Sequence, residues 1–208
     1  MDMPEEKDVA EVVTCQAGEG GCPMAVIDVK AVAQQLRDVL ADPELKRKLE
    51  EKLKKPLSFH SRFCAVVTGC PNACAQPQIR DFGVTGRAAI AFDESSCTEC
   101  AMCEDACKEG AITLVDGMPR IDTARCIGCC DCVRACQTDA LEVARPMCDV
   151  TAGGKLGRHP RLAESLGEFD TVEDVAECLR RVIQLLLSEG HKGERLGALL
   201  DRLAPSRP

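Results

Sequence analysis

Aromatic residues and net positive charge are scarce in this chain of 208 residues, which contains no Trp, no Tyr and five Phe. Without aromatic side chains on which bases can stack, a single-stranded nucleic acid lacks a binding platform. Acidic residues outnumber basic residues by 34 to 26 and give a formal net charge of −8, whereas binding to nucleic-acid phosphates requires a basic surface. We therefore expect no nucleic-acid partner.

Long apolar runs are also lacking. No stretch approaches the roughly 18 consecutive apolar residues that make a candidate membrane-spanning helix. The chain starts with MDMPEEKD, which has neither the basic start nor the apolar core of a secretory signal peptide. We expect a cytoplasmic protein without a membrane span, of a size that suits one or two small domains.

Cysteine, by contrast, is abundant, with 16 residues. Secreted chains use such a density for disulfides, but the cytosol keeps thiols reduced. Metal binding by thiolates is therefore the better explanation.

Eight cysteines form two runs with identical spacing, Cys97-x2-Cys100-x2-Cys103-x3-Cys107 and Cys126-x2-Cys129-x2-Cys132-x3-Cys136. Bacterial ferredoxins with two [4Fe–4S] clusters have this spacing, and the fourth cysteine of each run binds the other cluster. One predicted ligand set is therefore Cys97, Cys100, Cys103 and Cys136, and the other is Cys126, Cys129, Cys132 and Cys107. The usual proline after the fourth cysteine is replaced by Lys108 and Gln137. Four-cysteine zinc sites are the structural alternative.

Helical and strand patterns lie on both sides of these runs. Helices are predicted over residues 29–40, from Pro43 onward, from Thr171 to about Ser188, and over residues 194–203. Strands are predicted at residues 63–68, in one or two pieces at 83–92, and at 111–115, 118–121 and 140–143. The simplest arrangement is an α+β domain formed by residues 12–94 and 146–204. A ferredoxin-like insertion over residues 95–145 interrupts it and needs metal to fold.

A second group of cysteines carries a more specific signal. Residues 63–84 contain Gly69-Cys70-Pro71-Asn72-Ala73-Cys74, and this segment resembles the sirohaem-binding segment of sulfite and nitrite reductases. The surroundings of Cys15 and Cys22 resemble the upstream cysteine pair of the same family. Residues 153–161 and 193–197 resemble the C-terminal part of anaerobic, dissimilatory-type sulfite reductase subunits, which also have a ferredoxin insertion.

The resemblance implies a third [4Fe–4S] cluster and a sirohaem. The implied cluster ligands are Cys15, Cys22, Cys70 and Cys74, with Cys74 at the position that bridges the cluster to the sirohaem iron. Sirohaem carries many carboxylates, so cations are expected around it. The candidates are Arg80, Arg87, Lys155, Arg158, His159 and Arg161. The implied reaction is reduction of a small oxyanion such as sulfite or nitrite, with electrons that a redox partner protein supplies.

The chain departs from the family pattern in two places. Six residues separate Cys15 from Cys22, one more than usual, which leaves Cys64 as an alternative ligand in place of either. The family also has a further half-domain ahead of the first cysteine, which the resemblance implies is lacking here. A homodimer or a larger reductase complex would then cover the exposed haem edge. The remaining cysteines, Cys130, Cys148 and Cys178, are expected to be packing residues.

Two other functions stay open at this point. In the first, the chain is a non-enzymatic electron carrier with three clusters and no sirohaem. In the second, it is an assembly, regulatory or electron-transfer subunit of a larger reductase. The glycine-rich basic loop at residues 153–161 favours the sirohaem enzyme, because a scaffold for clusters alone has less need of these cations.

Overall fold

The strands of the computed structural model are β1 (Ala10–Thr14), β2 (Phe63–Thr68), β3 (Phe82–Phe92), β4 (Ile112–Val115), β5 (Met118–Ile121), β6 (Leu141–Ala152) and β7 (Glu164–Phe169). Its helices are α1 (Val29–Leu40), α2 (Pro43–Lys52), α3 (Met102–Ala106), α4 (Asp131–Ala135), α5 (Val172–Glu189) and α6 (Leu196–Leu203). Short 3-10 turns are η1 (Gln16–Gly18), η2 (Pro77–Ile79) and η3 (Glu94–Ser96). The structure describes residues 8–53 and 61–204.

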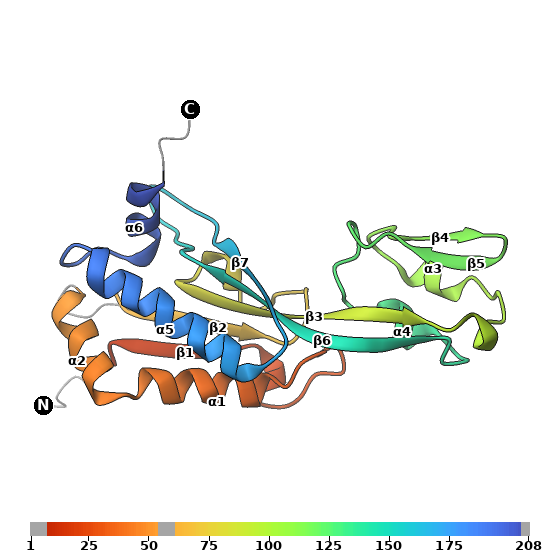
Figure 1. Ribbon diagram of the computed structural model, residues 1–208, viewed down its shortest axis with the longest axis horizontal. Helices are drawn as coiled ribbons and strands as arrows, with labels where there is room; N and C mark the ends of the chain where they lie inside the picture. Colours follow the sequence, from red (N-terminus) through yellow and green to blue (C-terminus); the bar gives the residue numbers. More distant parts are fainter. Residues whose placement is uncertain (1–7, 54–60, 205–208) are drawn as a thin grey trace, which may run out of the picture.

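These elements form an elongated molecule with a larger and a smaller part (Figure 1). The larger part contains a five-stranded sheet with the order β1-β2-β3-β6-β7, and the smaller part contains the hairpin β4-β5. Strands β1, β2 and β3 are parallel, whereas β6 and β7 run antiparallel to their neighbours. The fold is therefore α+β, as the sequence predicts.

The long helices lie where their sequence patterns place them. Asp42 and Thr171 each accept a backbone N–H through a side-chain oxygen at the first turns of α2 and α5, and Asp28 does the same for α1. Helix α5 ends before Gly190. The predicted helices over residues 29–40, 171–188 and 194–203 are thus confirmed to within two residues.

One face of the five-stranded sheet forms the main core. Alternate side chains of β2 and β3 point to this face, where Phe63, Ala65, Val67, Phe82 and Val84 are buried against α1, α5 and α6. Burying a large apolar side chain of this kind stabilises a fold by about 1.5–3 kcal/mol. The helices therefore fix the sheet from one side.

The opposite face of the sheet is more polar. Thr68 donates from its hydroxyl to the Val84 carbonyl at 3.1 Å, and its oxygen lies 3.3 Å from the Thr85 hydroxyl. Asp149 and Thr151 on β6 pair in register with Thr85 and Gly83 on β3. Turn η2 packs here, because a Cβ on Gly83 would lie 2.7 Å from the Pro77 Cβ. Arg87 on β3 lies on this face as well, 3.9 Å from Asp149.

Two strands connect the larger part to the smaller part. β3 and β6 pair from Phe82–Ala152 at one end to Phe92–Leu141 at the other, with a bulge between Ala89 and Ile90. Residues 83–92 are therefore one strand, and the predicted strand at 140–143 is the beginning of β6. The bulge lies opposite the predicted domain boundary near residue 145, where it bends the paired strands. The division into residues 12–94 with 146–204, and 95–145, stays a prediction.

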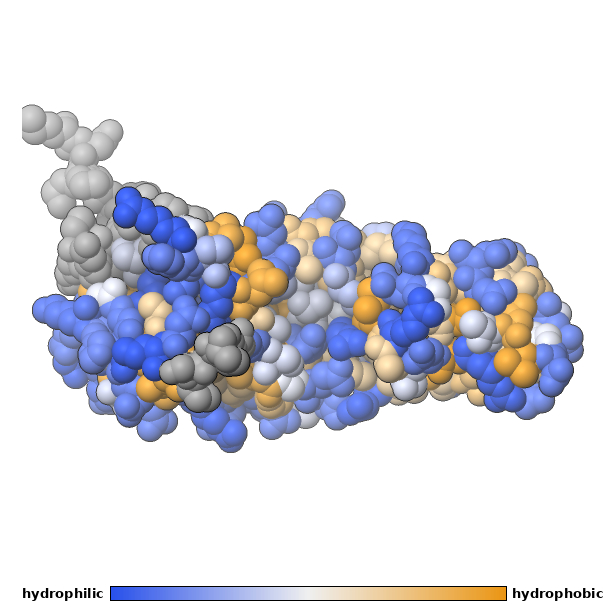
Figure 2. Space-filling view, turned by 90° about the horizontal axis from the view of Figure 1, so that it is seen from above, coloured by the Kyte–Doolittle hydropathy of each residue, from blue (hydrophilic) through white to orange (hydrophobic). Residues whose placement is uncertain are grey.

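Surface composition differs along the molecule. Figure 2 shows hydrophobic surface over the middle of the larger part and at the far end of the smaller part. Exposed large apolar residues include Leu156, Leu162 and Leu166 before or within β7, and Met102 and Val115 in the smaller part. In the described ranges 8–53 and 61–204, no helix is long and apolar enough to cross a membrane.

Candidate metal centres and cofactor site

The smaller part contains two cavities whose walls hold the two predicted ferredoxin ligand sets. The first cavity is lined by Cys97, Cys100, Cys103 and Cys136, among other residues. The second is lined by Cys107, Cys126, Cys129 and Cys132, together with Cys130. Each cavity therefore takes three thiols from one run and the last thiol from the other run.

This exchange follows from the local structure of the two runs. In each run the last cysteine ends a short helix, Cys107 for α3 and Cys136 for α4. The two helices pack against each other, which brings each final cysteine to the opposite loop. The repeat extends to the backbone, since Ala101 and Cys130 both precede their helices with a φ of 63°.

Backbone N–H groups point at several of these sulfurs. The Ala111 N–H donates to the Cys107 Sγ at 3.2 Å, and the Glu99 N–H donates to the Cys97 Sγ at 3.5 Å. Hydrogen bonds to sulfur stabilise the negative charge of a thiolate-bound cluster and tune its reduction potential. The donor set thus fits an iron–sulfur cluster in each cavity.

The third predicted set lies at the carboxyl ends of the parallel strands β1 and β2. Burial raises the pKa of the Cys70 thiol, and the neighbouring thiols of Cys22, Cys74 and Cys15 raise it further. A like charge has this effect, and Cys22, Cys74 and Cys15 are the thiols that exert it on Cys70. Bound metal reverses such a shift, because a coordinating thiol is deprotonated.

Close backbone packing holds the loops of this third set. The Gly69 N–H donates to the Cys15 Sγ at 3.4 Å, and the Asn72 Nδ2 donates to the Cys74 Sγ at 2.9 Å. A Cβ on Gly69 would lie 2.8 Å from the Ala25 Cβ, so a larger residue would displace the loop. Cys74 is exposed, whereas the other three thiols are half-buried.

Among the described residues, no three side chains of His, Cys, Asp or Glu converge closely enough to share one metal ion. A zinc ion would need four ligands at about 2.0–2.3 Å from one point.

The predicted sirohaem cations are only partly available for a ligand. Lys155 Nζ lies 2.7 Å from Asp201, and Arg161 binds Asp201, Glu164 and the Gly153 carbonyl. Both side chains are largely buried, and together they connect the basic loop to α6. The hydrogen bond from Lys155 lowers the pKa of the Asp201 carboxyl.

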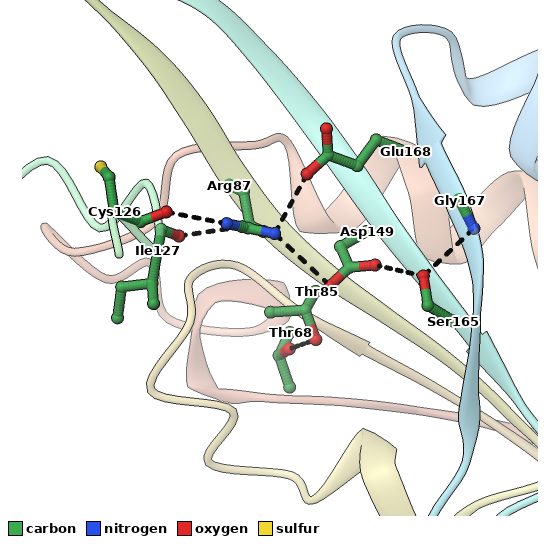
Figure 3. Close-up of polar contacts among 9 residues, drawn as sticks. All are labelled: Thr68, Thr85, Arg87, Cys126, Ile127, Asp149, Ser165, Gly167 and Glu168. Atoms are coloured by element: carbon green, nitrogen blue, oxygen red, sulfur yellow. Dashed lines mark hydrogen bonds and ion pairs between the residues drawn. The ribbon is translucent and has the colours of Figure 1, made fainter. Parts of the chain in front are cut away.

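Arg87 is bonded within the chain through all three of its guanidinium nitrogens. Its partners are the carbonyls of Cys126 and Ile127 and the carboxylate of Glu168 (Figure 3). It therefore connects the two parts of the molecule, and each of its guanidinium nitrogens already donates one hydrogen bond within the chain. Arg158 and His159 are exposed on the loop, and Arg80 is half-buried before β3.

Two charged residues near Arg80 are not evident from the sequence alone. The buried Asp81 accepts the Cys64 N–H at 3.0 Å and an Arg195 N–H at 2.8 Å. Burial raises the pKa of this carboxyl, and Arg195 opposes the shift. A charged residue directly before a buried strand is the sequence signal for Asp81, but its partner lies 114 residues away.

The thiols outside the three sets are buried. Cys64 lies on β2 and is 3% exposed, and Cys130, Cys148 and Cys178 are 3%, 6% and 9% exposed. Cys148 and Cys178 belong to the main hydrophobic core. A role for Cys64 in place of Cys15 or Cys22 stays a prediction.

Comparison with known proteins places this geometry in a family. The family model of the nitrite and sulphite reductase 4Fe-4S domain matches residues 5–206. The coenzyme F420-dependent sulfite reductase of Methanocaldococcus jannaschii is 29% identical over 107 residues, which are 51% of this chain and 15% of that protein. An anaerobic sulfite reductase subunit of Salmonella typhimurium is 31% identical over 101 residues, 49% of this chain and 25% of that protein.

A solved structure supports the fold. The dissimilatory sulfite reductase I structure matches with a TM-score of 0.64 and 21% identity, over 92% of this chain and 49% of that chain. The chain thus spans a quarter or less of the two curated relatives and about half of this structure. Because the family model covers nearly all of its residues, this chain belongs to the nitrite and sulphite reductase 4Fe-4S domain family of iron–sulfur proteins.

Proposed function

We propose that the chain is a sulfite or nitrite reductase-like redox protein with three [4Fe–4S] clusters and a sirohaem. The observation that carries the proposal is that two predicted sets of four thiols line two separate cavities, while the third predicted set lies in the loops that follow β1 and β2. Two sets lie in the smaller part and the third lies at the polar edge of the large sheet. Electrons would pass from the first two clusters to the third.

Sirohaem, when bound, supplies the iron at which an oxyanion such as sulfite or nitrite is reduced. Cys74, the exposed thiol of its set, is the residue proposed to face it. Arg80, Arg158 and His159 are the cations proposed to bind its carboxylates, since charge-assisted hydrogen bonds to carboxylates are the strong ones. Lys155 and Arg161 are already paired with Asp201, so we propose that they hold the loop in place.

A redox partner protein would donate electrons at the far end of the smaller part. Cys100 of the first set is exposed there, beside the exposed Met102. Glu99, Glu104 and Asp105 surround this position in the sequence, which favours a partner with a basic surface. Long-range attraction between opposite charges speeds association and weakens with salt. The rate of reduction by such a partner should therefore fall as ionic strength rises.

Thiolate-bound clusters are stable only where thiols stay reduced, so we propose a cytoplasmic location. The polar sheet face and the exposed Cys74 leave one side of the site open to a second chain. A larger reductase complex or a homodimer is therefore part of the proposal.

Anaerobic purification tests the proposal directly. Three clusters predict about twelve irons and about twelve acid-labile sulfides per chain, and sirohaem adds sharp absorption bands in the red. About eight irons would remove the third cluster. A colourless protein that holds zinc instead would overturn the whole proposal.

A second function is favoured by one specific observation. Lys155, Arg161 and Arg87 all bond to groups of the chain itself, so these predicted sirohaem cations are engaged elsewhere. A carrier with three clusters and no sirohaem fits this arrangement. It predicts the same iron count, but no red absorption bands after sirohaem is supplied.

A further inference from the structure

The junction between the two parts of the molecule is built on a stretch of β3 that pairs with β6 on one edge and with no described strand on the other. β2 pairs with β3 as far as Thr85, so the next residues of β3 expose one edge. The Ala88 N–H donates to the Gly128 carbonyl at 3.1 Å. Gly128 has a φ of +69°, and a Cβ there would lie 2.6 Å from the Ala88 carbonyl oxygen. The loop that follows Cys126 therefore lies directly on β3.

The side chain of Arg87 also bonds to the loop that follows Cys126. Its Nε donates to the Ile127 carbonyl and one terminal nitrogen donates to the Cys126 carbonyl, both at 3.0 Å (Figure 3). The planar, multi-donor guanidinium suits two neighbouring acceptors, which a lysine cannot bridge in the same way. Cys126 belongs to the second predicted ligand set, so the positive charge of Arg87 lies at the backbone of a ligand.

Two carboxylates hold the other end of the guanidinium. The remaining terminal nitrogen donates to Glu168 on β7 at 3.0 Å and lies 3.9 Å from Asp149 on β6. Asp149 in turn accepts from the Ser165 hydroxyl at 3.4 Å. Arg87 is thus tied to β6 and β7 as well as to the loop (Figure 3).

The same short stretch of β3 also touches the loop of the third set. Gly86 packs so closely on the residue before Cys70 that a Cβ would lie 2.4 Å from the Gly69 carbonyl oxygen. Residues 86–88 therefore contact the loops of two ligand sets, the one that includes Cys70 and the one that includes Cys126.

We infer that Arg87 is a positioning residue that fixes the Cys126 loop against β3 and whose charge raises the reduction potential of the cluster in the second cavity. The inference rests on the proposed function, because it requires that cluster. Reduction adds one negative charge, which a neighbouring cation stabilises. Without Arg87, the carboxylates of Glu168 and Asp149 would lose the cation that pairs with them.

The test compares Arg87→Gln and Arg87→Lys with Arg120→Gln, which alters an exposed arginine on β5. Redox titration of the anaerobic holoprotein, followed by electron paramagnetic resonance, gives the potential of each cluster. We expect Arg87→Gln to lower the potential of one ferredoxin cluster, Arg87→Lys to restore most of it, and Arg120→Gln to leave it unchanged.

Amide hydrogen exchange distinguishes the effect of Arg87 on the position of the Cys126 loop from the effect of its charge. In both Arg87 variants the peptide that contains Ala88 should exchange faster, because lysine keeps the charge but does not bridge two carbonyls. Loss of one cluster with the other ferredoxin cluster retained would also support the inference. Unchanged potentials and exchange in Arg87→Gln, or an equal shift in Arg120→Gln, would overturn it.

The wild-type protein distinguishes this failure from a failure of the proposed function. If it contains no ferredoxin clusters, the proposed function is wrong before any variant is made. If it contains them and Arg87→Gln behaves like wild type, the inference about Arg87 alone is wrong.

Discussion

Burial separates the sixteen thiols of this chain, all of which lie in the described ranges, into two kinds. The four outside the predicted sets are buried, whereas within the sets only Cys132 is. Burial raises the pKa of Cys64 to about 12 and that of Cys148 to about 11, since a thiolate is poorly solvated there. Partial exposure suits a cluster ligand, because iron and sulfide must reach its thiol from solution while the cluster assembles.

Thiol alkylation checks this division at Cys64. With a pKa of about 12 in place of 9.0, its thiolate fraction at pH 8 is roughly 1,000-fold lower than that of an ordinary cysteine. Labelling of the native protein with iodoacetamide should leave Cys64 unmodified at pH 8, with a rate that rises about tenfold per pH unit. After chelation and oxidation of the clusters, mass spectrometry should find the predicted ligands labelled first. Rapid labelling of Cys64 in the native protein would contradict its burial.

The buried Asp81 gives a stability prediction at the same scale. Asp81→Asn removes the charge that faces Arg195, and breaking a buried pair costs about 3–5 kcal/mol. The melting temperature of the anaerobic protein should then fall on the order of 10 °C. Asp170→Asn is the matched control, because the Asp170–Arg145 pair is about half-exposed and should cost less than about 1 kcal/mol. Equal falls in melting temperature for the two variants would contradict the larger contribution that we assign to the Asp81–Arg195 pair.

Among the helices, strands and loops, contacts between backbones decide where the ligand loops lie. β3 approaches the loop after β2 so closely that a Cβ on Gly86 would lie 2.4 Å from the Gly69 carbonyl oxygen, and a Cβ on Gly69 would lie 2.8 Å from the Ala25 Cβ. Glycine is needed there because of space and not because of a positive φ. The position of the third ligand set therefore depends on β3, which contributes none of its cysteines.

Gly86→Ala should consequently damage the third cluster alone. The added Cβ would lie 2.4 Å from the Gly69 carbonyl oxygen, so the loop that carries Cys70 must move. Iron per chain should fall from about twelve to about eight, with the two ferredoxin signals intact. Gly20→Ala serves as the control, since no atom lies within 4 Å of a Cβ at that position. A full iron count in Gly86→Ala would contradict the prediction.

Across the molecule as a whole, the two parts differ in the size of their hydrophobic cores. The larger part buries side chains from β2, β3 and β6 and from α1, α2, α5 and α6. The core of the smaller part contains Ile112, Cys132 and Leu141 as its buried residues, and Cys132 is itself a predicted cluster ligand. We therefore predict that a module with so small a core needs metal to fold.

Removal of iron should therefore unfold one part and spare the other. After anaerobic chelation, hydrogen exchange should show lost protection over residues 97–136 and retained protection in β2, α1 and α5. Reconstitution with iron and sulfide should restore the lost protection. Cooperative loss over both parts would mean that the clusters also hold the large sheet together.

The amino-acid sequence was sufficient for whatever depends on neighbours along the chain. Helix spacing and capping residues located α1, α2 and α5, because those interactions span three or four residues. The identical spacing of two cysteine runs predicted two ligand sets, and the members of each set line one cavity of the smaller part. The segment from Gly69 to Cys74 indicated the family.

Features that depend on distant partners became visible in the folded chain alone. β1 and β7 are strands because they pair with β2 and β6, and their own residues carry no clear period. Two sets of contacts join residues that are 39 to 114 positions apart. They are the hydrogen bond between Asp81 and Arg195 and the hydrogen bonds of Arg87 with Cys126, Ile127 and Glu168. A side chain's charge predicts that it will find a partner, but the packing of sheet, loop and helix selects which one.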